Sequence, residues 1–227
     1  MQPPRVGIIV PPDNHVAEVE AAVDLTGCCT VHVARFPPVR ELPMRDRLAT
    51  YNTQVGFCAD TLAGLAPAAV LVACTGSSYL LGPEDDDVLY RGVSAETGSE
   101  VRGICRCIRD RLASVAARSI VLVSPYEPWL TDLSVGYWDA AGIKVAEVYA
   151  VGGGRHPYVI GEHEISAALD GVTDRVADAV LVTGTGVATL HAVQCAQQRL
   201  SVPVLSSMRC GLDWLRSIVT RPPKTQL

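Results

Sequence analysis

Residues 69–76 read Ala-Val-Leu-Val-Ala-Cys-Thr-Gly, and residues 179–186 read Ala-Val-Leu-Val-Thr-Gly-Thr-Gly. Six of these eight residues are identical at an offset of 110. Residues 5–12, Arg-Val-Gly-Ile-Ile-Val-Pro-Pro, align in the same way with residues 118–125, Arg-Ser-Ile-Val-Leu-Val-Ser-Pro, at an offset of 113. Two offsets this close predict a duplicated unit of about 110 residues. The alternative explanation is that buried parallel strands resemble one another by composition alone.

Short runs rich in β-branched residues alternate along the chain with longer stretches of helical period. Continuous apolar runs are typical of strands buried on both faces of a parallel sheet. Their alternation with helices indicates an open, doubly wound α/β protein. The expected strands cover residues 6–10, 30–34, 69–73, 119–123, 144–148, 179–182 and 202–205, and the expected helices cover residues 15–25, 43–64, 97–114, 127–141, 163–177, 187–199 and 207–218.

The 227 residues carry a net charge of −5 and contain no basic block, which argues against nucleic-acid binding. No apolar run approaches the roughly 20 residues of a membrane helix, and the first run is too short for a signal peptide. The eight cysteines lack zinc-site spacing, and without a secretory signal a disulfide framework is not expected. We therefore expect a cytoplasmic protein without a metal, in which most thiols are buried packing residues.

Ligands of open α/β sheets bind beyond the carboxyl ends of the strands. Four such ends carry unusual residues, at positions 11–14, 74–78, 124–126 and 183–186. If the two halves of the chain face each other about a pseudo-twofold axis, these four segments converge on one cleft. The sequence therefore predicts a binding site between the halves.

The segment that begins with Cys74 is the strongest candidate for chemistry. A thiol at a strand end meets backbone N–H groups, which stabilise a thiolate. Thr75 and Ser77 add hydroxyl groups, and Gly76 lets the backbone approach a ligand, so the segment is suited to holding a carboxylate. The alternative is a buried structural cysteine in a Ser/Thr turn.

The matching segment in the second half contains Gly184, Thr185 and Gly186. It again offers a hydroxyl and backbone N–H groups for a carboxylate, although a tight turn between strand and helix would also use glycine. Neither segment carries the Gly-x-Gly-x-x-Gly or Gly-x-x-x-x-Gly-Lys pattern of nucleotide-binding loops. We therefore expect no dinucleotide cofactor.

Four further polar residues are candidates for the site. Asn14 can bond a carboxylate or cap the following helix, and both roles are compatible. Tyr126 can donate to an oxyanion or pack over a turn. After three glycines, Arg155 can clamp a carboxylate and His156 can move protons near neutral pH, unless this segment is only a solvent-exposed loop.

These residues carry a resemblance to a known group of enzymes. Pro11-Pro12-Asp13-Asn14-x-x-x-Glu18 resembles the Pro-Ser-Ser-Asn-x-x-x-Glu opening of maleate isomerases. Residues 73–77, 124–126 and 182–186 resemble, in the same order, the first cysteine loop, the tyrosine turn and the second cysteine loop of that group. The chain is thus similar to the aspartate/glutamate racemase superfamily, in its branch of maleate cis-trans isomerases and arylmalonate decarboxylases.

The resemblance implies an α/β fold of two pseudosymmetric parallel-sheet (flavodoxin-like) halves, with the active site in the cleft between them. It also implies a small carboxylate or dicarboxylate substrate, no cofactor and a homodimer. We expect the first half to contain residues 1–114 and 205–227, and the second half residues 115–204. In the family, two cysteines face each other across the substrate, whereas this chain has Cys74 on one side and Gly184 at the other position.

The missing second cysteine leaves several activities open. In a maleate isomerase-like enzyme, Cys74 adds to the alkene while Tyr126, His156 or water handles protons. In an arylmalonate-type decarboxylase, Cys74 is the sole proton donor. A racemase would need a second base other than cysteine, and a non-catalytic relative would only bind the ligand. We favour the isomerase because the segments around Asn14 and Cys74 both resemble isomerases.

Overall fold

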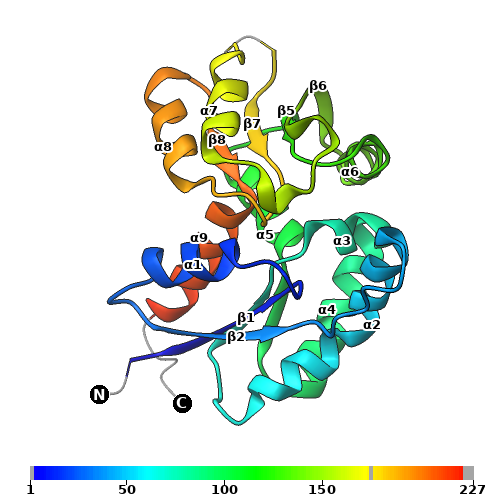
Figure 1. Cartoon of the computed structure of the whole chain (residues 1–227). Coiled ribbons are helices and arrows are strands. Elements are labelled where there is room, and N and C mark those ends of the chain that lie inside the picture. The colour runs from blue at the N-terminus through cyan, green and yellow to red at the C-terminus, as the bar shows by residue number, and fades with distance from the viewer. Residues whose placement is uncertain (1–2, 174–175, 222–227) are drawn as a thin grey trace.

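The computed structural model of the chain describes residues 3–173 and 176–221 (Figure 1). The first parallel sheet has the order β2-β1-β3-β4, and the second has the order β6-β5-β7-β8. The strands of the first sheet are β1 (Arg5–Val10), β2 (Thr30–Arg35), β3 (Ala69–Val72) and β4 (Glu100–Gly103). Those of the second are β5 (Ser119–Ser124), β6 (Lys144–Ala150), β7 (Ala179–Val182) and β8 (Val204–Ser206). The identical strand order confirms an α/β fold with two pseudosymmetric halves.

Helices cover both sheets and complete each half. They are α1 (Val16–Asp24), α2 (Met44–Ala63), α3 (Thr75–Leu81), α4 (Pro83–Thr97), α5 (Ile104–Ser114), α6 (Pro128–Ala140), α7 (Glu162–Asp170), α8 (Leu190–Arg199) and α9 (Ser207–Val219), with 3₁₀ turns η1 (Gly152–Gly154) and η2 (Pro157–Val159). In the part of the chain that the structure describes, no helix combines the length and apolar character needed to cross a membrane.

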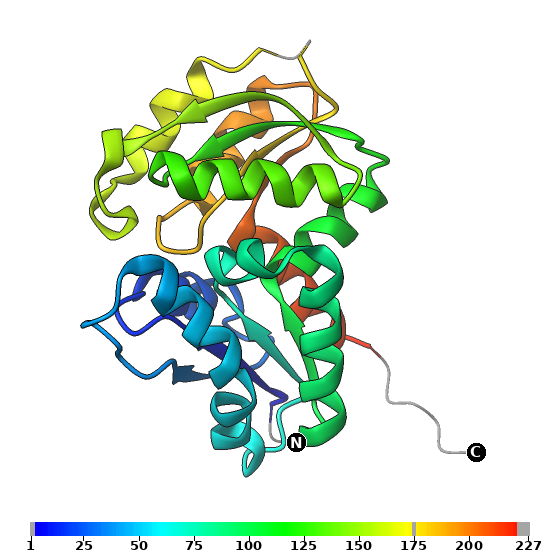
Figure 2. The same ribbon diagram turned by 90° about the vertical axis from the view of Figure 1, so that its right-hand side faces the viewer.

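The C-terminal part of the chain returns to the first half. Strand β8 pairs with β7 in the second sheet, and α9 then packs against α5, α1 and β3 (Figure 2). The proposed division of the chain at residues 114 and 205 stays a prediction, and its residues 1–2, 174–175 and 222–227 lie outside the described residues.

The repeated apolar runs form the centres of the two sheets. All four residues of β3 and all four of β7 are buried. In β7, Leu181 packs into the core that continues through the first half, whereas Val180 and Val182 pack into a second core beneath α7 and α8. Both faces of the strand are thus apolar, and each buried aliphatic side chain contributes about 1.5–3 kcal/mol to folding.

The strand pairing in the two sheets shows which residues of β1 and β5 occupy equivalent positions. Val6 lies opposite Ala69 in the first sheet, and Ile120 lies opposite Ala179 in the second. Ile120 therefore takes the place of Val6 at an offset of 114, one residue more than the sequence alignment predicts. The difference arises because pairing partners, rather than residue types, decide which positions of two strands are equivalent.

The predicted helix over residues 97–114 is wrong in its first part, because residues 100–103 form β4. This short strand lies at the edge of its sheet, and its charged residues Glu100 and Arg102 conceal the apolar pattern of a strand. The expected helices also left out the segment after Cys74. In the structure, α3 follows Cys74 directly and α4 begins with Pro83. β4 occupies the place in the first sheet that β8 occupies in the second.

A buried carboxylate lies at the contact between the halves. Asp86 of α4 is fully buried and accepts a hydrogen bond from the Tyr137 hydroxyl of α6 at 3.2 Å. Burial raises the pKa of Asp86 to about 6, although bonds from Ser78 and Tyr137 and the nearby Arg109 act in the opposite direction. Compared with the unfolded chain, the folded protein therefore favours the protonated form of this carboxyl.

This raised pKa predicts a pH-dependent effect of Asp86→Asn on stability. In the wild type, stability from the protonated carboxyl is present below pH 4 and is lost as the pH rises through about 6. Asp86→Asn should therefore raise the free energy of unfolding by on the order of 2–3 kcal/mol at pH 8 and change it little at pH 4. Urea unfolding at both pH values measures this, and Asp85→Asn, at an exposed neighbouring position, is the control. An equal effect of Asp86→Asn at both pH values would contradict the prediction.

Candidate active site

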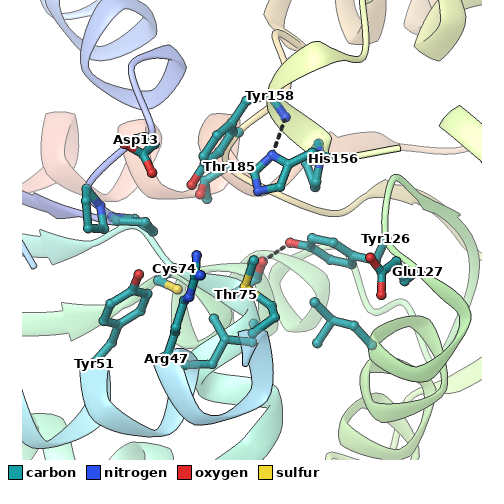
Figure 3. Close-up of a pocket in the computed structure, with 18 of the residues that line it drawn as sticks. Asp13, Arg47, Tyr51, Cys74, Thr75, Tyr126, Glu127, His156, Tyr158 and Thr185 are labelled. Carbon is teal, nitrogen blue, oxygen red and sulfur yellow. Dashed lines mark hydrogen bonds between the residues drawn. The ribbon is translucent and has the colours of Figure 1, made fainter. Parts of the chain in front are cut away.

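A cavity of about 150 Å³ lies where the carboxyl ends of β1, β3, β5 and β7 meet (Figure 3). Both halves contribute to its walls. The lining residues are Pro11, Pro12, Asp13, Met44, Arg47, Leu48, Tyr51, Cys74, Thr75, Gly76, Tyr126, Glu127, Trp129, Leu130, His156, Pro157, Tyr158, Thr185 and Gly186. Within residues 3–173 and 176–221, no group of three or more His, Cys, Asp or Glu side chains is placed to hold a metal ion.

Cys74 lies at the base of this cavity and precedes the first turn of α3. Its side chain is almost completely buried, with 4% exposed. Burial raises the pKa of the Cys74 thiol, while hydrogen bonds from Ser77 and from the Gly76 N–H lower it. The expected N–H groups are therefore present, but desolvation outweighs them, and the resting thiol is protonated at neutral pH. Ser77 does not line the cavity, and its hydroxyl also donates to the Cys74 carbonyl at 3.1 Å.

Two hydroxyl groups from different halves meet beside the thiol. The hydroxyl groups of Thr75, on α3, and Tyr126, which follows β5, are joined by a hydrogen bond (Figure 3). Burial raises the pKa of Tyr126 above its ordinary range, so the phenol stays protonated and available as a donor. The pair can donate to an oxyanion or a carboxylate in the cavity.

Thr185 supplies a third hydroxyl from the second half. Its Oγ1 accepts a hydrogen bond from Asn14 Nδ2 at 3.0 Å and donates to the Ala73 carbonyl at 2.8 Å. Asn14 Oδ1 accepts from the Ala17 N–H at 3.1 Å, so the same side chain caps α1 and connects to Thr185. Asn14 is fully buried behind the wall of the cavity and orients Thr185 rather than lining the cavity itself.

The two glycines beside Thr185 leave space for aromatic side chains. Gly184 has φ +95°, and a Cβ there would lie 3.3 Å from the Tyr126 hydroxyl. At Gly186, a Cβ would come within 2.2 Å of Cε1 in the Tyr158 ring. Tyr126 therefore stands beside the position at which the family resemblance places a second cysteine, and Tyr158 depends on glycine at position 186.

His156 and Arg155 take different places although they are adjacent. His156 lines the cavity, and its Nδ1 accepts a hydrogen bond from the Tyr158 N–H at 3.4 Å. Arg155 is half-exposed and lies outside the cavity, where it pairs with Glu164 and donates to the Gly152 carbonyl. The expectation that Arg155 clamps a carboxylate is corrected on this point, because its guanidinium already has a carboxylate partner on α7.

Sequence reasoning missed several polar residues that line the cavity, among them Arg47 and Tyr51 of α2, and Tyr158 of η2. Burial raises the pKa of Tyr51 to about 12 and raises that of Tyr158 still further. No motif surrounds these residues. Arg47 and Tyr51 lie four residues apart on α2, so a helical-face analysis of residues 43–64 could have paired them but not placed them at the site.

Comparison with known proteins defines the class of this α/β protein and its site. A family model described as arylmalonate decarboxylase matches residues 6–225, and the chain belongs to that family. The maleate isomerase of Nocardia farcinica is 26% identical over 219 residues, covering 91% of this chain and 86% of that protein. The maleate isomerase of Geobacillus stearothermophilus is 25% identical over 224 residues, covering 89% and 86%.

Solved structures of these enzymes share the fold. The maleate isomerase Iso from Pseudomonas putida S16 has a TM-score of 0.87 and 19% identity, with 97% of this chain and 94% of that chain covered. The Nocardia farcinica maleate cis-trans isomerase has a TM-score of 0.84 and 25% identity, covering 96% and 93%. An arylmalonate decarboxylase has a TM-score of 0.82 and 17% identity, covering 98% and 96%. These relatives support an enzyme, while the expected homodimer and cytoplasmic location stay predictions.

The contact between Gly186 and Tyr158 predicts the effect of adding one methyl group. Gly186→Ala should lower the free energy of unfolding by about 1–3 kcal/mol, because the new Cβ overlaps the Tyr158 ring. Removing the ring in Gly186→Ala/Tyr158→Ala should relieve this overlap, so the two changes should not be additive in urea unfolding. Gly136→Ala, at a helical position with open space, is the control and should not destabilise the protein. Simple additivity of the two changes would contradict the predicted contact.

Proposed function

We propose that this protein is a cofactor-independent cis-trans isomerase of a small unsaturated dicarboxylate such as maleate. The observation that carries the proposal is the placement of Cys74 in a cavity beside the hydroxyl groups of Thr75, Tyr126 and Thr185. The structure of a cysteine-to-serine mutant of the Nocardia farcinica maleate isomerase, 25% identical to this chain, contains a covalently bound succinylcysteine intermediate. That adduct supports a cysteine that adds to the substrate.

The proposed reaction needs a single thiol. The Cys74 thiolate forms a C–S bond to one alkene carbon, and the π electron pair moves onto the other carbon and its carboxylate as an enediolate. Hydrogen bonds from the remaining hydroxyl hydrogen of the Thr75–Tyr126 pair and from nearby backbone N–H groups stabilise this charge. The carbon–carbon bond is now single and rotates. Return of the electron pair then re-forms the alkene and expels the thiolate, with no net gain or loss of a proton.

The thiol proton must leave before the addition. His156 lines the same cavity, but its Nδ1 lone pair already accepts the Tyr158 N–H, so in this proposal the thiol proton leaves through water to solvent. Tyr126 and Tyr158 cannot act as bases for this step. Burial raises the pKa of both phenols and keeps them protonated. In this proposal the tyrosines are hydrogen-bond donors, and the thiol takes its proton back from solvent after the thiolate is released.

A decarboxylase of a substituted malonate is the second candidate, and the residue at position 184 favours it. Because position 184, where the family resemblance places the second cysteine, is glycine, only one face of an intermediate would meet a thiol. Loss of carbon dioxide breaks a carbon–carbon bond and leaves the electron pair on an enediolate. Cys74, protonated at neutral pH because burial raises its pKa, then donates its proton to one face. A single product enantiomer follows from this arrangement.

Removal of the thiol tests the role of Cys74. Cys74→Ser should lower turnover of maleate to fumarate at least about 1,000-fold, because a hydroxyl is a far weaker nucleophile near neutral pH. Acid-quenched wild type should carry a mass increase equal to one maleic acid on Cys74. Cys195→Ala, which removes an exposed thiol, is the matched control and should retain both turnover and the adduct. Carbon dioxide from phenylmalonate, with no fumarate from maleate, would instead establish the decarboxylase.

The pH dependence separates the two candidates. A Cys74 pKa above the ordinary value of about 8.5 means that the thiolate fraction rises with pH. For the isomerase, kcat/KM should therefore rise about tenfold per pH unit between pH 7 and 8.5. For a decarboxylase that uses the protonated thiol, kcat/KM should be level across this range and fall only above the thiol pKa. A level profile with maleate would contradict thiolate addition in the rate-limiting step.

A further inference from the structure

The charged side chains that line the cavity differ in how fully they are paired with other residues of the protein. Two are carboxylates with partners of their own, since Asp13 pairs with Arg40 at 2.7 Å and Glu127 accepts from Trp129 Nε1 at 2.8 Å. Among the described residues that line the cavity, Arg47 is the permanently charged cation. A ligand with two negative charges therefore meets two fixed carboxylates and one guanidinium.

Arg47 is held in place by the segment before its helix. Its Nε donates to the Leu42 carbonyl at 2.6 Å, and its Nη2 donates to the Arg40 carbonyl. The side chain is half-buried, and Nη1 has no hydrogen-bond partner in the described parts of the chain. Figure 3 shows the side chain rising from α2 between Tyr51 and Thr75 into the cavity. Two nitrogens thus fix the guanidinium, and the third stays available to a ligand.

We propose that Arg47 is a specificity-determining residue that binds the second carboxylate of a dicarboxylate substrate. This inference rests on the proposed function, in which the hydroxyl pair of Thr75 and Tyr126 and nearby backbone N–H groups hold the carboxylate that becomes the enediolate. The second carboxylate is attached to the carbon that Cys74 attacks, so it lies closer to the thiol than the carboxylate that becomes the enediolate. In the view of Figure 3, the Arg47 side chain lies between Cys74 and Thr75, and Tyr126 lies beyond Thr75, which fits this division.

The surroundings explain why a cation is needed there. Leu48, Leu130 and Met44 make this part of the wall apolar. An unpaired carboxylate loses hydration on entering such a site, whereas a charge-assisted hydrogen bond to guanidinium compensates that loss. A monocarboxylate places an uncharged group beside Arg47 and gains nothing from it. Arg47 therefore selects dicarboxylates over monocarboxylates of similar size.

Binding of unreactive acids tests this role separately from catalysis. Succinate and butyrate have similar carbon chains but differ in the second carboxylate, and calorimetry measures their dissociation constants. Wild type should bind succinate more tightly than butyrate, and Arg47→Met should weaken succinate binding about 10- to 100-fold. Butyrate binding should stay unchanged. Arg47→Lys should recover part of the succinate affinity, because it restores the charge without the planar fork.

Arg45→Met is the matched control, since Arg45 lies two residues earlier on α2, is exposed and does not line this cavity. It should bind both acids like wild type. Equal losses for succinate and butyrate in Arg47→Met would overturn the proposal, because they would show only that Arg47 positions residues 40–42. No loss for succinate would overturn it as well. Intact Arg47-dependent succinate binding in a protein that does not convert maleate would refute the isomerase and leave this inference standing.

Discussion

The buried hydroxyl of Thr185 connects the two halves at the point where the candidate chemistry occurs. It accepts from Asn14, which follows β1, and donates to the carbonyl of Ala73, which directly precedes Cys74. One side chain of the second half thereby binds two strand ends of the first. A buried polar group is costly without partners, so these bonds strongly favour one relative placement of the halves. The position of Cys74 beneath the opposite wall depends on that placement.

Other polar contacts between the halves surround this connection. The hydroxyl groups of Tyr79 and Thr183 are hydrogen-bonded to each other, and the Glu20 carboxylate accepts the N–H groups of Thr189 and Leu190 at the start of α8. The interface therefore combines these polar contacts with an apolar core that extends from the first half into the second. Its donors and acceptors are directional, so it specifies a geometry that apolar packing alone would leave less defined.

Burial controls the protonation of the thiol and the phenols that line the cavity. The cavity-lining thiol of Cys74 and the phenols of Tyr126 and Tyr158 all have raised pKa values with desolvation as the largest cause. Backbone N–H groups beside Cys74 oppose that effect without reversing it. The resting thiol and these two phenols are thus neutral donors, and an ionised thiol has to be generated for addition to the substrate. The low local dielectric around these buried groups also strengthens each hydrogen bond to a developing enediolate.

The sequence by itself determined the strands of the duplicated core, the meeting of their carboxyl ends and the placement of Cys74 among the segments of 11–14, 124–126 and 183–186. These features follow from short apolar runs and from the residues directly after them, which are local properties of the chain. It did not reveal β4, whose charged edge residues hide the strand, although the repeat itself contained a counterpart in β8. Only the tertiary structure brought Arg47, Tyr51 and Tyr158 to the cavity, directed Arg155 away from it and kept the thiol protonated. These outcomes depend on which distant side chains meet and on how much water their contact excludes, and neither quantity is encoded in any single segment.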